Sequence, residues 1–241
     1  MAALVWDRTG EHFYETGISK GVLFTANNDS TAQLDTPGWN EGKAWSGLIS
    51  VSESPEGADE EAFYADNIKY LALRGVEDFG GSISAYQSPE EFDECDGSVA
   101  LNANYAGVTI GQQPRKAFCL AYVTQKGNDV EGNEAGYVIH IIYNATASPS
   151  EREYQTINDS PEPNELSWDF SSSPVPVTGH KPTSIVRIDS TKFTTQAAKA
   201  KLKTIEDALF GVDADKTASI TEVKPHVLLP NDIITILAAN G

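Results

Sequence analysis

Residues 116–144 read KAFCLAYVTQKGNDVEGNEAGYVIHIIYN, and two β-rich apolar runs here flank a glycine-rich acidic loop. Both runs have the length and apolar character of a strand, so the stretch predicts an antiparallel hairpin. Each run is apolar on both faces: Ala117, Cys119, Ala121 and Val123 oppose Phe118, Leu120 and Tyr122, and Tyr137, Ile139, Ile141 and Tyr143 oppose Val138, His140 and Ile142. Such a sheet needs a cover on both sides, either from the chain's own helix or loop or from another subunit.

Similar short runs recur along the chain between clusters of Gly, Asn, Asp, Ser and Pro, as expected for an antiparallel β-sandwich or barrel. The predicted strands span residues 4–7, 21–26, 44–52, 67–74, 81–86, 116–125, 136–144, 165–171 and 183–189. In ELSWDF, Leu166, Trp168 and Phe170 share one face. Ser167 and Asp169 share the other, so one side of this strand is expected to face water.

Two segments predict helices. SPEEFDEC has Ser88 as a possible N-cap, Pro89 next and Glu91 three residues after the cap, which is a capping-box pattern. Residues 194–210 have helical spacing at Ala198, Leu202, Ile205 and Leu209, with Thr194 or Thr195 as the cap and Gly211 as the stop. The single apolar face of this second helix suits either a lid over a sheet or a contact with a neighbouring subunit.

Length and composition favour one main domain. The chain has 241 residues, of which 40% are hydrophobic. We expect a β-sandwich domain over residues 1–193, with a long exposed loop at 27–66, and a C-terminal helix and tail over 194–241 that pack on the same domain. The opening MAALVWDRTG has no signal-peptide pattern, and the two cysteines fit free thiols, so a soluble protein made in a cytoplasm is expected.

The charge and the motifs argue against several function classes. A formal net charge of −18 argues against a protein that binds nucleic acid by neutralising its phosphates. Asp129, Glu131 and Glu134 could bind calcium in the acidic loop, but their spacing does not match a calcium-binding loop. The four histidines are scattered, and the sequence contains neither a nucleophile elbow nor a phosphate-binding glycine loop. We therefore expect a cofactor-free, non-enzymatic protein that assembles.

Several stretches resemble the major tail tube proteins of long-tailed bacteriophages of Gram-positive hosts. They are LVWDRTGEHFYETGISKGVLF, AWSGLISVSESPEGAD, YADNIKYL, SPEEFDECDG, GVTIGQQPRKAFCLAYVTQKGND, GYVIHIIYNATASPSEREYQTINDSPE, PTSIVRIDS, LKTIEDALFG and LLPNDIITIL. The resemblance implies a mainly β protein with a flanking helix, whose rings of six stack into a hollow tube with a continuous inner β-barrel. It also implies a place in the virion tail after assembly in the host cytoplasm, away from membranes.

The same resemblance implies partners and contact residues. The partners would be further copies of the chain, the tape measure, tail tip and tail terminator proteins, and double-stranded DNA that passes through the lumen without specific binding. From the net charge we expect acidic residues to line that lumen, where they would repel phosphates, and we expect the 27–66 loop to contact the next ring. The expected subunit-interface residues are Phe118, Leu120, Tyr122, Asp129, Glu131, Val138, His140, Ile142, Leu202, Ile205 and Leu209.

Two other function classes stay open at the level of sequence. A β-sandwich that binds carbohydrate could use Trp39, Trp45, Tyr64 or Tyr70 as stacking groups, although such aromatic residues more often lie in cores or interfaces. A hydrolase could use paired carboxylates such as Glu60 and Glu61. Adjacent residues point in different directions, however, which makes a solvated surface the simpler interpretation.

Overall fold

A computed structural model describes residues 4–28, 36, 38–57, 60–75, 77–102, 105, 107–149, 152–154, 156, 163–214 and 221–239. Its main element is one antiparallel sheet with the order β2-β1-β9-β10-β11-β6-β3, and β12 also pairs with β10. The strands are β1 (Tyr14–Thr25), β2 (Lys43–Trp45), β3 (Leu48–Gly57), β6 (Glu77–Ala85), β9 (Phe118–Asn128), β10 (Gly132–Pro149), β11 (Leu166–Ser172) and β12 (Ile185–Asp189). The chain is therefore mainly β, as predicted.

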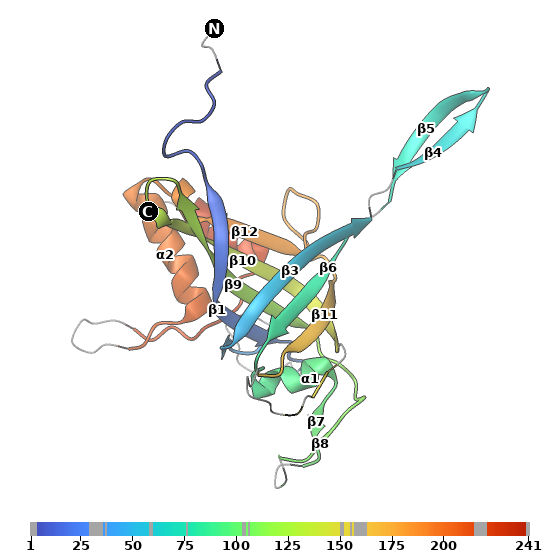
Figure 1. Cartoon of the computed structure of the whole chain (residues 1–241), viewed down its shortest axis with the longest axis vertical. Coiled ribbons are helices and arrows are strands. Elements are labelled where there is room, and N and C mark those ends of the chain that lie inside the picture. The colour runs from blue at the N-terminus through green and yellow to red at the C-terminus, as the bar shows by residue number, and fades with distance from the viewer. Residues whose placement is uncertain are drawn as a thin grey trace.

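Strand β10 pairs with different strands along its length. Val138 to Ile142 pair with β12, whereas Ala145 to Pro149 pair with β11. The register against β9 shifts between these two stretches, and Asn144 has a positive φ of 46° there. An irregularity of this kind bends and twists a strand, so β11, β6 and β3 turn away and cross in front of β9 and β10 (Figure 1).

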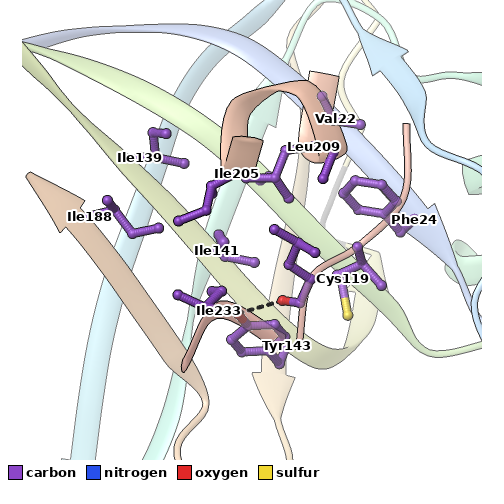
Figure 2. Packing of buried hydrophobic residues seen from close by; sticks show 14 of the residues in the cluster. Val22, Phe24, Cys119, Ile139, Ile141, Tyr143, Ile188, Ile205, Leu209 and Ile233 are labelled. Atoms are coloured by element: carbon purple, nitrogen blue, oxygen red, sulfur yellow. Dashed lines mark hydrogen bonds between the residues drawn. The ribbon is translucent and has the colours of Figure 1, made fainter. Parts of the chain in front are cut away.

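The first core lies between the sheet and the two longer helices, α2 (Gln196–Phe210) and α3 (Pro230–Ala238). Figure 2 shows side chains of β1, β9, β10 and β12 meeting Ile205 and Leu209 of α2 and Ile233 of α3. The Thr195 side chain caps α2 by accepting a hydrogen bond from the Ala198 N–H, which confirms one of the two predicted caps. The apolar face of α2 is thus a lid over the chain's own sheet.

The second core covers the opposite face of β9 and β10. Phe118, Leu120 and Ile142 pack there against Ile83 of β6 and Trp168 of β11. Short helical segments η1 (Glu90–Phe92) and α1 (Asp93–Asp96) close one end of this core, and the Phe92 ring lies 5.1 Å from that of Trp168 and 5.3 Å from that of Phe118. The chain itself therefore covers both apolar faces of the central hairpin.

Several sequence expectations are corrected by the structure. Residues 4–7 form no strand, and the predicted strand 44–52 is divided into β2 and β3 by a turn at Gly47, whose φ is +84°. Residues 27–66 are not one long loop, because β2, β3 and β4 (Glu60–Ala65) lie within them. Ser88 is not a cap: Pro89 takes that position, without a side-chain hydrogen bond.

Three segments project from the body (Figure 1). The first is a two-stranded hairpin of β4 and β5 (Ile68–Arg74), which continues outward from β3 and β6. The second is the short pair β7 (Val99–Ala100) and β8 (Thr109–Ile110) at the opposite end of the long axis. The third is the N-terminal stretch before β1, which extends toward the same end as the β4–β5 hairpin.

Candidate assembly surfaces

The β4–β5 hairpin has apolar side chains on both of its faces. Phe63 pairs with Leu71, while the alternation of the strand places Tyr70 on the other face. The large apolar side chains Phe63, Tyr64, Ile68, Tyr70, Leu71 and Leu73 are 39–73% exposed. Asp66 and Asn67, both with positive φ, form the tight turn between the strands. An isolated two-stranded hairpin is marginally stable in water, so contact of these apolar side chains with another molecule would stabilise this one.

The N-terminal segment is also apolar and exposed. Leu4, Val5 and Trp6 are 59–78% exposed. The segment is attached to the β9–β10 turn by the Asp129 carboxylate, which accepts hydrogen bonds from the backbone N–H groups of Gly10 at 2.9 Å and His12 at 3.3 Å. The bond from Gly10 is the main reason why the pKa of Asp129 is lowered.

A third exposed apolar group lies on the β7–β8 segment, by which we mean the described residues of 97–116. Leu101, Tyr105, Val108 and Ile110 are 42–63% exposed there. In a chain of net charge −18, residues 97–116 contain no Asp or Glu, and their only charged residues are Arg115 and Lys116. The segment is therefore an apolar projection without a carboxylate of its own, and its Lys116 forms an ion pair with Glu94 of α1.

The outward face of β3, β6 and β11 has a different chemistry, and we call it the serine face. The register places Ser167 beside Ser84 and Ser50, Asp169 beside Ser82 and Ser52, Ser171 beside Gly80 and Ser54, and Asp78 beside Glu56. The inward residues of the same strands, such as Ile83 and Trp168, are buried. The serine face thus presents small hydroxyl groups and three carboxylates, with no cationic or aromatic residue among these eleven positions.

A polar network joins β3 to the layer behind it. Glu53 of β3 accepts hydrogen bonds from the Tyr122 hydroxyl at 2.6 Å and from His140 Nδ1 at 3.1 Å, and it forms an ion pair with Arg187. The Tyr122 and His140 rings stack with their centroids 4.7 Å apart. Burial opposes ionisation of Glu53, but the bonds from His140, Tyr122 and Arg187 outweigh it and lower the pKa to about 2.

This network predicts a pH-dependent stability. The unfolded pKa of Glu53 is about 4.5 and the folded pKa about 2, so its stabilisation is complete above pH 4.5 and is lost as the pH falls toward 2. At neutral pH the carboxylate is expected to contribute about 2 kcal/mol, because water still reaches part of it. Glu53→Gln should therefore lower the free energy of unfolding, measured with urea, at pH 7 and hardly change it at pH 2. A difference that is equal at both pH values would contradict the assignment.

Most of the expected interface residues are buried within the subunit. His140 is 6% exposed. The apolar ones are at most 5% exposed, and they are Phe118, Leu120, Tyr122, Val138, Ile142, Leu202, Ile205 and Leu209. In this conformation these side chains are covered by their own chain and not available to a second one. Asp129 and Glu131 lie at the surface, although Asp129 is already engaged with the N-terminal segment. Sequence reasoning missed the exposed groups of the hairpin and the β7–β8 segment.

Other candidate chemistry is limited in the part of the chain that the structure describes. No three His, Cys, Asp or Glu side chains there are grouped so that they could hold a metal ion. No helix among the described residues has the length and apolar character needed to cross a membrane. Of the aromatic residues considered for sugar stacking, Trp45 is buried and Trp39 is partly buried, whereas Tyr64 and Tyr70 are exposed on the hairpin.

The chain is similar to phage tail components. No curated protein matches it. In the cryo-EM structure of the extended sheath–tube complex of PVC, an extracellular contractile injection system, one chain is 11% identical, with 70% of this chain and 88% of that chain covered and a TM-score of 0.32. In the baseplate of the anti-feeding prophage, one chain is 10% identical, with 77% and 97% covered and a TM-score of 0.31. The family model of the phage tail tube protein matches residues 14–221, and the chain therefore belongs to the phage tail tube protein family.

Proposed function

We propose that this chain is the repeating subunit of a tail tube, in which rings of six stack into a hollow conduit for double-stranded DNA. The observation that carries the proposal is the β4–β5 hairpin, whose apolar side chains on both faces lack a cover from the described body of the chain. Burying them against further copies stabilises an assembly by about 25 cal/mol for each Å² of apolar surface removed from water.

The serine face is our candidate for the wall of the lumen. DNA slides past a wall that offers it neither cations nor aromatic stacking, and carboxylates add repulsion toward phosphates. The serine face has no cation or aromatic ring and has three carboxylates. It lies on β3, β6 and β11, the strands that cross in front of β9 and β10. Strand β3 ends the sheet order, and no described strand pairs with its outer edge, so this edge could pair with a neighbour and continue the sheet around a ring.

The contact between rings is assigned to the hairpin. It includes β4, which lies within the 27–66 stretch expected to make that contact, and β5, which lies beyond it. Residues 29–35 and 37 of that stretch lie outside the described part of the chain. The tape measure, tail tip and tail terminator proteins, and a Gram-positive host, remain proposals that rest on the resemblance.

The test is negative-stain electron microscopy of the purified protein over a concentration series, with light scattering for mass. Rings or hollow tubes of uniform width are expected, either spontaneously or after addition of tail-tip complex. A chain that stays monomeric under both conditions would refute the proposal. Specific binding of a sugar by that monomer would instead favour the carbohydrate-binding alternative, for which the exposed Tyr64 and Tyr70 offer stacking groups.

A further inference from the structure

We infer that His140 is the centre of a proton-dependent switch that holds the outer end of β1, residues 14–16, more firmly at acidic than at alkaline pH. The switch is a row of four side chains from four strands. His140 of β10 lies between Glu53 of β3, 3.1 Å from Nδ1, and Thr124 of β9, 3.0 Å from Nε2. The Thr124 hydroxyl lies 3.4 Å from the carboxylate of Glu15 on β1. All four belong to one subunit, so the switch is present with or without assembly.

Glu53 determines which nitrogen of His140 can exchange a proton. The pKa of Glu53 is about 2, so its carboxylate is ionised near neutral pH and only accepts hydrogen bonds. Burial raises the pKa of Tyr122, whose hydroxyl therefore keeps its proton and donates to Oε1 of Glu53. Nδ1 faces the same oxygen and must also donate, whether the imidazole is neutral or charged. Proton uptake and release are thus left to Nε2.

The Thr124 hydroxyl couples the proton on Nε2 to Glu15, because it has a single hydrogen to donate. When His140 is neutral, Nε2 accepts that hydrogen and the Glu15 carboxylate receives none. When Nε2 takes up a proton from solvent, it donates to the Thr124 oxygen, and the hydroxyl hydrogen turns to Glu15. The charged imidazole also lies 3.9 Å from the Glu15 carboxylate, so the attraction of opposite charges adds to the bond.

The surroundings of the imidazole suit this role. His140 is 6% exposed, but a cleft of about 450 Å³ between β1 and β3 reaches its ring and gives water a route to Nε2. The cations nearest to it are already engaged, Arg187 of β12 with Glu53 and Lys126 of β9 with Asp189. Imidazole is the side chain that ordinarily changes its charge between about pH 5 and 8. The charge within the row therefore changes at the histidine.

The outer end of β1 is the part that such a switch can release. Residues 14–16 are exposed and belong to neither buried core, whereas residues 21–25 are buried. The register against β9 shifts on both sides of Ser19, and Gly17 and Lys20 there have positive φ values of 66° and 51°. These irregularities separate the outer end from the buried half. Because the outer end continues into the exposed apolar N-terminal segment, the switch would also set how firmly that segment is held.

The first test is the tautomer of His140 at pH 8. Nitrogen-15 NMR of the imidazole measures it in the soluble subunit, or by magic-angle spinning in tubes, and a His140→Gln variant identifies the signals. We expect the hydrogen on Nδ1. A hydrogen on Nε2 would overturn the inference, because Thr124 could then not donate to that nitrogen.

The second test is amide hydrogen exchange of residues 14–16 at pH 5.5 and pH 8, corrected for the chemical exchange rate and in one assembly state, checked by light scattering. All proteins carry His12→Gln, because His12 is a second histidine near this strand, 3.4 Å from Asp129. We expect about threefold higher protection at pH 5.5, the effect of a half-exposed ion pair. Residues 21–25 are the internal control and should show no such difference.

Variants of the row assign the effect to the hydroxyl relay. Thr124→Val keeps the shape of the side chain without its hydroxyl and should abolish the pH difference, whereas Thr124→Ser should retain it. Glu15→Ala should also abolish it, and the fold should tolerate this change because the Glu15 side chain is 50% exposed. A pH difference that persists in Thr124→Val and Glu15→Ala, or that is absent with the wild-type row, would overturn the inference. Neither result bears on whether subunits form tubes.

Discussion

Replacing residues 60–74 by a two-residue Asn-Gly turn is expected to give a folded monomer that forms no tubes. The hairpin contributes no residue to either buried core, so its removal should leave the thermal unfolding midpoint within a few degrees of the wild type. Assembly should fail because six large exposed apolar side chains on β4 and β5 would no longer be available to a second copy. Electron microscopy and sedimentation measure the assembly, and circular dichroism measures the fold.

A double variant tests the contribution of the hairpin's side chains while the hairpin itself is kept. Tyr64→Ser with Tyr70→Ser keeps the backbone pairing and should raise the concentration needed for assembly at least tenfold. Tyr154→Ser is the matched control, because Tyr154 is as exposed as Tyr64 but lies outside the three projections. Equal assembly by the double variant and the control would remove the hairpin from the proposed interface.

Lysines on the serine face should make assembled tubes retain DNA. Ser52→Lys with Ser82→Lys places two cations from each copy beside Asp169, in one register row of β3, β6 and β11. A wall that repelled phosphates would then attract them, and each lysine that neutralises a phosphate makes the slope of log K against log salt more negative by about 0.9. We expect short duplex DNA to remain with these tubes in a form resistant to nuclease at low salt, and to be released at high salt.

The control is Thr204→Lys, which adds a lysine to the exposed side of α2. DNA that binds this variant would lie outside the tube and be digested by nuclease. Nuclease-sensitive DNA on the Ser52→Lys, Ser82→Lys tubes would show that the serine face points outward. No retention of DNA by these tubes at any salt concentration would likewise remove the serine face from the lumen.

The central sheet could be predicted because its signal is local. The short apolar runs around Leu120 and Ile141 predict two paired strands, and the two-faced pattern of ELSWDF predicts the exposed side of β11. What covers the second face of the sheet could not be predicted, because Ile83 and Trp168 come to it from segments far away in the sequence. Asn144, with its positive φ, lies at the register shift where β10 changes partner from β12 to β11, and no local sequence pattern marks that position.

The surfaces proposed for function were harder to foresee for two reasons. The sequence EEAFYA of β4 lacks the β-branched run that marks a strand, and its partner β5 was predicted without it. The Glu53 network joins residues 69, 87 and 134 positions apart, which no local pattern brings together. Helix α3 was also missed, because Ile233, Ile234 and Thr235 favour strands, while Pro230 and the burial of Ile233 favour the helix.

The continuity of β10 has a mechanical consequence. Its 18 residues span roughly 60 Å and run without interruption from the helix-covered sheet into the strands that bear the serine face. In the proposed tube, the two layers of the wall would therefore be joined by covalent backbone in addition to side-chain contacts. When such a wall is flexed, the load passes along a strand whose hydrogen bonds are pulled together in shear. A subunit of this kind is expected to keep its two layers together, so the lumen would keep its width while the tube bends.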